Sequence, residues 1–341
     1  MTNKPLVSII TPCYNGESFI SRLLDSVLAQ TYPNLEFIIV NDGSTDNTEG
    51  VILSYRERFE ERGIKFIYIT KENGGVASAI NRGLEIFSGD FLTWPDSDDW
   101  MTPDSIAKKV ETLEANPECG LVIGQLDVRL EDSIDKSIGI LRCQSTQKRN
   151  IFEDVVFEKG IYVAPLGWMV RSDMFLKACP ERHIEDHNRM GQNWQMMLPV
   201  AYAYPCVFVD EIIGYYLVRS NSLSHSDKNS LTARRNKVDS FMKLKIGAIQ
   251  SIKDMDDQSK SKYINIIVQR YSHIKLKLSA QIHKRDWIEE DYNAIEEAGN
   301  ITFSDKAWRL RGISKAFDSA CKLVSLPLRA VKSLVRRVKQ R

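Results

Sequence analysis

The first hundred residues alternate short apolar runs with segments whose apolar residues recur at helical spacing. Apolar runs rich in β-branched residues predict four buried strands, at residues 6–12, 35–40, 66–69 and 90–94. Apolar residues three and four positions apart predict helices between them, at residues 19–28, 51–55 and 76–87. This alternation is typical of an α/β domain, in which helices cover both faces of a largely parallel sheet.

The rest of the chain changes character twice. Residues 100–225 mix strand and helix patterns, whereas residues 228–297 are helical and highly charged without strand signals. A basic segment follows. We therefore expect an α/β domain over residues 1–226, a helical extension over residues 227–300 and a basic amphipathic tail over residues 301–341.

Polar clusters directly follow three of the predicted strands. They are Asn41-Asp42, Glu72-Asn73 and the acidic stretch at residues 96–99. Ligands of parallel sheets bind beyond the carboxyl ends of the strands, where these clusters fall. The sequence therefore predicts a polar ligand site at this edge.

Two stretches of the chain resemble a known enzyme family. The amino-terminal signature of family-2 glycosyltransferases resembles residues 7–48, which read VSIITPCYNGESFISRLLDSVLAQTYPNLEFIIVNDGSTDNT. Its continuation resembles residues 71–100, which read KENGGVASAINRGLEIFSGDFLTWPDSDDW. The resemblance implies the GT-A fold, a Rossmann-like mixed sheet with helices on both faces. It also implies glycosyl transfer from a nucleotide sugar.

The acidic motif Asp96-Ser97-Asp98-Asp99 suits the diphosphate of such a donor. Hard carboxylate oxygens bind Mg²⁺ or Mn²⁺, which neutralise phosphate charge and stabilise a departing diphosphate. The resemblance implies that Asp98 is a direct metal ligand, that Asp96 faces the ribose or the metal, and that Asp99 lies nearby. The alternative is a solvated acidic turn that caps the following helix.

The resemblance also places the nucleoside at the ends of the first two strands. Asp42 corresponds to the family carboxylate that hydrogen-bonds the nucleoside, and Thr11, Pro12 and Tyr14 would line the base pocket. An Asx-turn with the following Gly43 and Ser44 is the other role open to Asp42.

Cations and glycines complete the expected donor site. Gly74, which follows Asn73, lets the backbone approach the donor closely. Many relatives carry an arginine where this chain has Ile80, so Arg82 is the candidate replacement for binding the phosphates. Arg219 stands where relatives often have histidine. It could bind phosphate oxygens or serve as an ion-pair partner, and His225 is a further candidate.

The acceptor side departs from the family pattern. Relatives have Glu-Asp-Trp, with the aspartate as general base, where this chain has Gln192-Asn193-Trp194. Because an amide cannot accept the proton, Asp186 is the first candidate for the base and Glu185 the second, unless both are surface-loop residues. Gln192 and Asn193 would hydrogen-bond the acceptor. Trp194 would form a sugar platform or pack against the sheet.

Charge is concentrated in the tail. From Asp305 onward, eleven Lys and Arg stand against two Asp, an excess of +9, so the remaining residues sum to −8 in a chain of net charge +1. Apolar residues bordered by Lys and Arg recur at helical spacing on both sides of Pro327, which is typical of helices on an anionic membrane surface. Packing on the body of the protein is the alternative. From Asp305 onward, only Trp308 and Phe317 offer aromatic stacking, so we expect no nucleic-acid partner.

The expected location is the cytoplasm, with peripheral attachment to the inner face of the cell membrane. The six cysteines lie far apart without a CxxC pair, which suits a reducing compartment. No segment resembles a signal peptide or has the roughly 18 consecutive apolar residues of a spanning helix.

The expected function is metal-dependent, inverting transfer of a hexosyl or N-acetylhexosaminyl group from a UDP-sugar. The acceptor would be a hydroxyl group of a glycan or lipid-linked glycan in surface-polysaccharide assembly, such as O-antigen or capsule. One alternative is a nucleotide-sugar-binding protein without transfer activity. The other is a membrane-docked assembly scaffold.

Overall fold

A computed structural model describes residues 4–147, 149–186, 192–219, 230–299, 301–315 and 318. The chain divides into two compact units: unit 1 contains Met1–Leu223 and Gly247–Met255, and unit 2 contains Ser224–Ile246 and Asp256–Arg341. This division lies close to the expected boundary after residue 226. Residues 247–255, however, belong with unit 1 rather than with the helical extension.

One mixed sheet forms the centre of unit 1. Within the described residues it contains nine strands in the order β3-β2-β1-β4-β8-β6-β9-β5, with β7 paired to β6. The strands are β1 (Val7–Cys13), β2 (Leu35–Asn41), β3 (Lys65–Thr70), β4 (Phe91–Thr93), β5 (Trp100–Met101), β6 (Leu121–Leu130), β7 (Ser133–Leu141), β8 (Trp168–Arg171) and β9 (Cys206–Val218).

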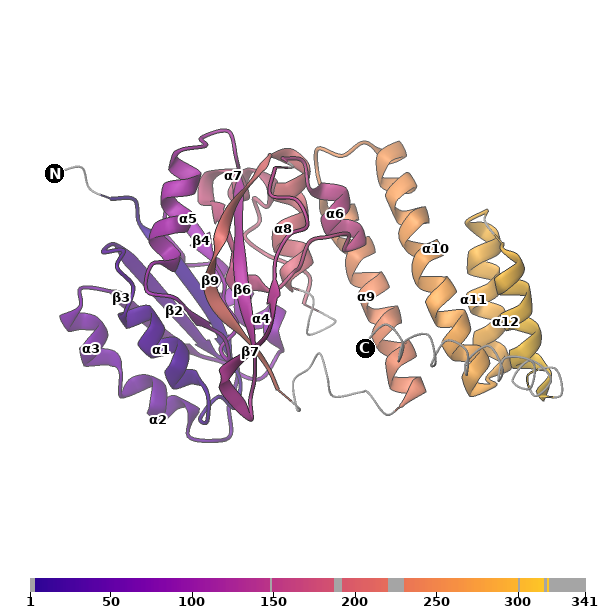
Figure 1. Cartoon of the computed structure of the whole chain (residues 1–341), viewed down its shortest axis with the longest axis horizontal. Coiled ribbons are helices and arrows are strands. Elements are labelled where there is room, and N and C mark those ends of the chain that lie inside the picture. The colour runs from indigo at the N-terminus through magenta and orange to yellow at the C-terminus, as the bar shows by residue number, and fades with distance from the viewer. Residues whose placement is uncertain are drawn as a thin grey trace, which may run out of the picture. The chain divides into compact units, whose positions relative to one another are not determined.

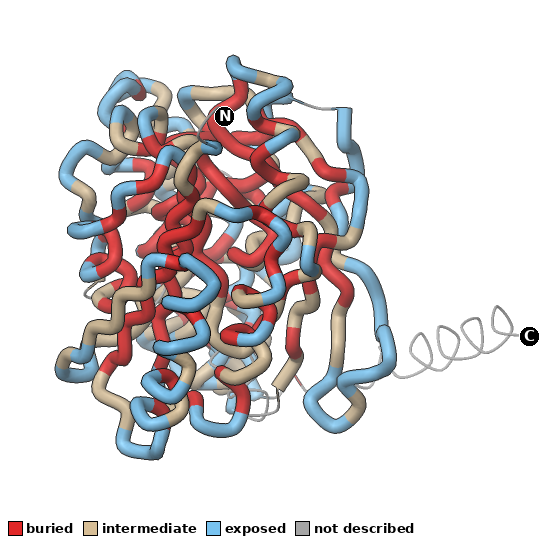
Figure 2. Tube along the Cα trace, turned by 90° about the vertical axis from the view of Figure 1, so that its left-hand side faces the viewer, coloured by how far each residue is buried: buried red, intermediate tan, exposed pale blue. Residues whose placement is uncertain are grey.

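The first four strands run parallel, as the sequence predicts. Strand β8 is antiparallel to β4 and β6, while β6 is parallel to β9. Strands β1 and β2 are buried at every position, part of the core drawn red in Figure 2. This burial on both faces explains why their sequences are continuous apolar runs rather than alternating ones.

Helices cover both faces of the sheet (Figure 1). The helices of unit 1 are α1 (Ile20–Leu28), α2 (Thr48–Leu53), α3 (Arg56–Glu61), α4 (Val76–Leu84), α5 (Ser105–Glu114), α6 (Phe152–Phe157), α7 (Ser172–Ala178) and α8 (Gln192–Ala203), with a 3₁₀ turn at Pro165–Gly167. Helices α1, α2, α3 and α5 share one core with alternate residues of β1 and β2, including Ile9 and Phe37. Helix α4 packs on Ile10, so closely that a Cβ on Gly83 would lie 2.4 Å from that side chain. The expected mixed α/β architecture is confirmed.

Unit 2 is helical, as expected for the extension. Its helices are α9 (Leu231–Ser251), whose residues up to Ile246 belong to this unit, α10 (Asp257–Ile282), α11 (Arg285–Glu297) and α12 (Phe303–Ile313). A small apolar core forms around Leu276, Ile288, Tyr292 and Ile295. No helix in the described part of the chain is long and apolar enough to cross a membrane.

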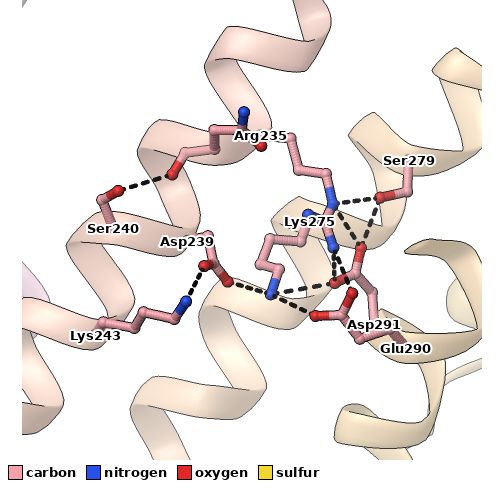
Figure 3. A network of polar contacts seen from close by, with 9 residues as sticks. Arg235, Asp239, Ser240, Lys243, Lys275, Ser279, Glu290 and Asp291 are labelled. Atoms are coloured by element: carbon pink, nitrogen blue, oxygen red, sulfur yellow. Dashed lines mark hydrogen bonds and ion pairs between the residues drawn. The ribbon is translucent and has the colours of Figure 1, made fainter. Parts of the chain in front are cut away.

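A buried ionic network joins three helices of unit 2 (Figure 3). Asp291 of α11 accepts from Arg235 of α9 at 2.9 Å and from Ser279 of α10 at 2.6 Å. Lys275 of α10 lies 3.3 Å from Asp291 and also pairs with Asp239 of α9. Removing one partner of a buried pair costs about 3–5 kcal/mol, because the other charge is left uncompensated. The network therefore fixes the positions of α9, α10 and α11 along one another.

A single lysine makes a testable contribution to the stability of unit 1. Lys109 on α5 is fully buried and donates to the carbonyl oxygen of Leu166 at 3.1 Å. Burial lowers the pKa of Lys109 from 10.5 to about 7. Between these two values the unfolded chain binds more protons than the folded protein. The free energy of unfolding therefore rises with pH in this window.

We expect Lys109→Met to remove the contribution of Lys109 to the pH dependence of the free energy of unfolding. Urea unfolding between about pH 7 and pH 9 should show the wild type gaining about 1 kcal/mol per pH unit relative to Lys109→Met. The exposed Lys177→Met on α7 serves as the control and should keep the wild-type pH dependence. Equal pH dependence in the wild type and Lys109→Met would contradict the burial-induced shift.

Candidate active site

The carboxylate of Asp42 joins the loops that leave β2 and β3. Its Oδ1 accepts from Lys71 Nζ and from the Gly74 N–H, both at 2.9 Å, and its Oδ2 accepts from the Gly75 N–H at 2.7 Å. Gly75 has φ +92° immediately before α4, in the region that favours glycine. Asp42 therefore fixes both the glycine loop and the start of α4.

The turn after β2 is closed by Asn41 rather than by Asp42. The Ser44 N–H donates to Asn41 Oδ1 at 3.0 Å, which is the Asx-turn considered for Asp42. Gly43 has φ +73°, and a Cβ there would lie 2.8 Å from the backbone nitrogen of Asn73. The two loops therefore pack backbone to backbone.

Asp96 and Asp98 follow β4 at the same edge and are both half-buried. Gln192 Nε2 donates to Asp96 Oδ1 at 3.4 Å, and Arg219 NH1 lies 3.6 Å from Asp98 Oδ2. Burial, together with the charge of Asp98, raises the pKa of Asp96 to about 7. Burial also raises the pKa of Asp98, against the charges of Arg219 and Arg22. A cation at these oxygens would relieve the cost of holding both charges.

Asp99 makes different contacts from the other two aspartates. It is fully buried, and its Oδ1 accepts from the Leu217 N–H of β9 at 2.8 Å. Its Oδ2 has no hydrogen-bond partner among the residues that the structure describes. Burial and the two neighbouring charges raise the pKa of Asp99 well above its usual range. For Asp99, expected as a nearby member of the metal-binding motif, these contacts favour a role in bracing the motif against β9 over direct metal ligation.

The carboxylates of the acidic motif suit a metal ion that binds together with a diphosphate. In the described part of the chain, no group of three or more His, Cys, Asp or Glu side chains could hold a metal ion. Mg²⁺ in nucleotide-binding sites, however, usually takes one or two carboxylates and completes its shell with phosphate oxygens and water. Asp96 and Asp98 fit that smaller requirement.

Arg219 directly follows β9 and lies beside the acidic motif. In addition to pairing with Asp98, it donates from Nε to Glu131 at 3.2 Å. Its guanidinium carbon lies 3.9 Å from the ring centre of Phe19. The ion-pair alternative for Arg219 is therefore realised in this structure, and the same position puts its donors beside the metal candidates.

Arg22 of α1 is a site residue that the sequence did not reveal. Its guanidinium lies over the ring of Trp100 at 5.6 Å, and Trp100 stacks on Tyr215 of β9 with ring centres 5.0 Å apart. Because Trp100 directly follows the acidic motif, this stack holds the motif's carboxyl-terminal end. An arginine at a helical surface position has no local signal for such a role.

The expected base-pocket residues cluster around the end of β1. Thr11 is buried, and its hydroxyl donates to the Pro95 carbonyl at 3.2 Å, one residue before the acidic motif. Pro12 is buried within β1, and Tyr14, just beyond the strand, is 48% exposed. Tyr14 thus offers an open ring at this edge, whereas the Thr11 hydroxyl is already engaged.

The remaining donor-side candidates differ in their surroundings. Asn73 is exposed in the glycine loop, and a Cβ on Gly74 would lie 2.6 Å from Ser78 Oγ. Arg82 pairs with Glu85 on the outside of α4. Arg82 therefore forms a surface ion pair in this structure, and its role at the phosphates stays a prediction. His225 lies outside the described residues.

On the acceptor side, the three residues that begin α8 lie in different environments. Gln192 contacts Asp96, while Asn193 Oδ1 is buried without a hydrogen-bond partner among the described residues. Trp194 is only 7% exposed, which favours packing over an open sugar platform. Of the base candidates, Asp186 is half-buried with Oδ2 3.5 Å from Asn81 Nδ2, and Glu185 is exposed.

Comparisons with known proteins agree on one family. Residues 8–176 match the model described as Glycosyl transferase family 2. The uncharacterized glycosyltransferase RT0329 of Rickettsia typhi is 46% identical over 112 residues, 33% of each chain. TuaG of Bacillus subtilis, whose name assigns it provisionally to teichuronic acid biosynthesis, is 45% identical over 33% of this chain and 44% of its own.

Solved structures extend the likeness to nearly the whole chain. The structure of TarS residues 1–349 of S. aureus, in complex with UDP-GlcNAc, gives a TM-score of 0.64 at 17% identity over 92% of this chain and 88% of that TarS fragment. The mannosyltransferase PcManGT of Pyrobaculum calidifontis, with GDP-Man and Mn²⁺, gives 0.50 at 17% identity over 95% of this chain and 88% of its own.

The chain therefore carries a family-2 glycosyltransferase domain with the GT-A fold. The sequence match spans a third of the length of RT0329.

We expect Asp42→Asn to loosen the glycine loop. An asparagine of the same shape turns one acceptor oxygen into a donor, so the Gly74 and Gly75 N–H groups cannot both be accepted. Losing one hydrogen bond to a charged group costs about 1.5–3 kcal/mol, or roughly 10–100-fold faster amide exchange. Hydrogen-exchange mass spectrometry of a peptide covering residues 71–77 measures this. Exposed Asp25→Asn on α1 is the control, and unchanged exchange in Asp42→Asn would contradict the anchoring role.

Proposed function

We propose that the protein transfers a sugar from a UDP-sugar to a hydroxyl group of a glycan or lipid-linked glycan, with inversion at the anomeric carbon. One observation carries the proposal. The Asp96 and Asp98 carboxylates, Arg219 and the loop anchored by Asp42 all follow the carboxyl ends of strands that run in the same direction, at one edge of the sheet. Arg219 lies beside Asp98 there. The GDP-Man bound to PcManGT and the UDP-GlcNAc bound to TarS support a nucleotide sugar as donor, and the TarS complex supports a UDP-sugar in particular.

The donor's diphosphate is the group that the acidic edge would receive. Asp96 and Asp98 would hold a divalent cation, Mn²⁺ or Mg²⁺, which neutralises the diphosphate and stabilises it as a leaving group. Arg219 would donate to phosphate oxygens. The open ring of Tyr14 and the end of β1 would receive the base, with Asp42 bonding the nucleoside while it holds the glycine loop.

A carboxylate outside α8 must accept the acceptor's proton, because Asn193 cannot. We assign this role to Asp186, whose half-buried carboxylate lies near Asn81, in preference to the exposed Glu185. Asp186 takes the hydroxyl proton while the hydroxyl oxygen bonds the anomeric carbon. The bond from that carbon to the diphosphate oxygen breaks, and its electrons leave with UDP. Gln192 and Asn193 would orient the acceptor.

The acceptor class is supported by a named relative. The provisional assignment of TuaG to teichuronic acid biosynthesis favours a surface polysaccharide as acceptor, the setting in which O-antigen and capsule also belong. Such acceptors present hydroxyl groups, which match the proton-accepting role given to Asp186.

We expect Mn²⁺-dependent UDP release that disappears in Asp98→Ala. The assay uses a panel of UDP-sugars that includes UDP-GlcNAc, with water as a slow acceptor. Since a metal contributes several kcal/mol to stabilising the leaving charge, the rate should fall at least about 100-fold in the variant or with EDTA. Asp173→Ala, at an exposed position on α7, should keep the wild-type rate.

Two outcomes would point to the alternatives. Calorimetric binding of UDP with Mn²⁺, but no release even when glycan acceptors are added, would favour a nucleotide-sugar-binding protein without transfer activity. Wild-type function of Asp98→Ala in cells would favour an assembly scaffold. Absence of UDP binding would contradict the donor-site assignment.

We propose further that the carboxyl-terminal region docks on the anionic inner face of the cell membrane. In α12, Phe303 is 87% and Leu310 52% exposed, and a spacing of seven residues puts them on one helix face. The basic part of the sequence follows them. An apolar face continued by Lys and Arg suits an anionic lipid surface, where a lipid-linked acceptor is presented.

Reversing Lys332, Arg336 and Arg337 to Glu should weaken binding to vesicles that contain phosphatidylglycerol. Each basic residue near such a surface contributes about 1 kcal/mol, so losing three should lower the partition coefficient about 100-fold. Vesicle co-sedimentation measures this. The matched control reverses three basic residues elsewhere: Lys177, Lys262 and Arg285. Equal losses in both variants, or no loss, would refute docking through the tail.

A further inference from the structure

Two side-chain amides hold the backbone just before Asp186. Asn81 of α4 accepts the Ile184 N–H through Oδ1 at 2.8 Å and donates from Nδ2 to the Ile184 carbonyl at 2.9 Å. Gln195 of α8 accepts the Glu185 N–H through Oε1 at 2.7 Å and donates from Nε2 to the Glu185 carbonyl at 2.8 Å. Each amide satisfies one donor and one acceptor, which fixes the orientation of both amide groups. We call this pair the amide clamp.

The clamp works because successive residues of an extended chain point their N–H and C=O groups to opposite sides. Ile184 presents its pair to α4, and Glu185 presents its pair to α8. The same double exchange joins hydrogen-bonded residues in an antiparallel ladder. Both amides are buried, so breaking an exchange would leave polar groups unsatisfied at about 1–3 kcal/mol each. The segment is therefore held like a strand although its partners are side chains.

Asn81 also reaches the side chain of the candidate base. Its Nδ2 lies 3.5 Å from Asp186 Oδ2 and 3.5 Å from His183 Nε2. We call residues 183–186 the clamped segment. Its ionisable side chains are those of His183, Glu185 and Asp186. The donor that holds the Ile184 carbonyl thus also faces the carboxylate.

Helix α8 relates the clamp to the acidic motif. Gln192 and Gln195 are three residues apart, so they lie on one face of the helix about 5–6 Å apart. Gln192 donates to Asp96, and Gln195 holds Glu185. One turn of α8 therefore connects Asp96, a candidate metal ligand, to the clamped segment.

We propose that Asn81 and Gln195 are positioning residues that hold Asp186 at the donor site as the general base. The inference rests on the function proposed above, in which Asp186 is that base. A base carried on a helix is positioned by the helix itself. In this chain, the helix position that holds the aspartate in relatives holds Asn193, so the proposed base lies in the clamped segment before α8. The amide clamp then fixes the backbone that a helix would otherwise fix.

The test compares near-isosteric variants. Asn81→Asp and Gln195→Glu keep the acceptor oxygen but place a second oxygen opposite a backbone carbonyl, and Asn81→Asp also sets a charge beside Asp186. Gln30→Glu is the matched control. Gln30 is likewise buried, donates to the Ser26 and Thr102 carbonyls at 2.9 and 2.8 Å, and accepts the Ile106 N–H at 3.1 Å.

Three quantities are measured for each variant: the UDP-release rate with Mn²⁺ as a function of pH, the calorimetric affinity for UDP with Mn²⁺, and the melting temperature. We expect the rate to fall about 10–100-fold in both clamp variants, because small misplacements of a reacting group have effects of this size. UDP affinity should stay at the wild-type value. In Asn81→Asp the acidic limb of the rate–pH profile should move to higher pH, because the added carboxylate faces the Asp186 carboxylate and like charges disfavour each other.

Gln30→Glu should lower the melting temperature while keeping the wild-type rate and midpoint. Clamp variants that behave like Gln30→Glu would overturn the inference, and so would a loss of UDP affinity. If Gln195→Glu does not fold, Gln195→Met removes both bonds without opposing oxygens, and the same outcomes apply. Asp98→Ala is run in parallel. If it retains UDP release, the proposed function fails; if it loses release while the clamp variants do not, only the clamp inference fails.

Discussion

Hydrogen bonds from the loop after β3 to the Asp42 carboxylate hold two parallel strand ends together, and the rest of the candidate site extends from that point. Asp42 fixes the Gly75 N–H at the start of α4. Further along α4, Asn81 holds the segment that leads to Asp186. Helix α8 holds the same segment from its other side and contacts Asp96. The glycine loop, the acidic motif and the base candidate are therefore linked through hydrogen bonds of backbone and buried polar groups.

Electrostatics sets the second constraint. Asp96, Asp98 and Asp99 stand within four residues of sequence, and burial raises the pKa of all three. Asp99 is bonded to β9, and Asp98 is compensated in part by Arg219 and Arg22. Asp96 accepts from the Gln192 amide, and no cation pairs with it among the residues that the structure describes. An arrangement of this kind holds unfavourable charge that a cation shared with a diphosphate would relieve, so the proposed function would couple metal binding to donor binding.

The sequence predicted the four parallel strands and their helices because apolar periodicity is a local property. It also predicted that Asp42 and the acidic motif meet at one edge, since strand ends in a parallel sheet must. It did not predict that Asn41 rather than Asp42 closes the turn, because an Asx-turn at either residue fits the local sequence. It also did not predict that Asp99 bonds β9, and it left open whether Trp194 packs or forms a platform. Those two outcomes depend on how β9 and α8 pack, which the residues near Asp99 and Trp194 do not encode. Arg22 and Asn81 were missed because their partners, Trp100 and Ile184, lie far away in the sequence. Gln195 was missed because it binds the backbone of Glu185, and a backbone partner leaves no side-chain signal in the sequence.

The central claim is that the carboxyl edge binds a nucleoside diphosphate through a metal on the acidic motif. X-ray diffraction from crystals grown with UDP and Mn²⁺, using anomalous scattering to locate manganese, tests it most directly. The account predicts a manganese ion about 2.1 Å from an Asp98 oxygen and from the diphosphate, with the base beside Tyr14 and Asp42. Manganese or UDP bound elsewhere, with the acidic motif free of both, would contradict it.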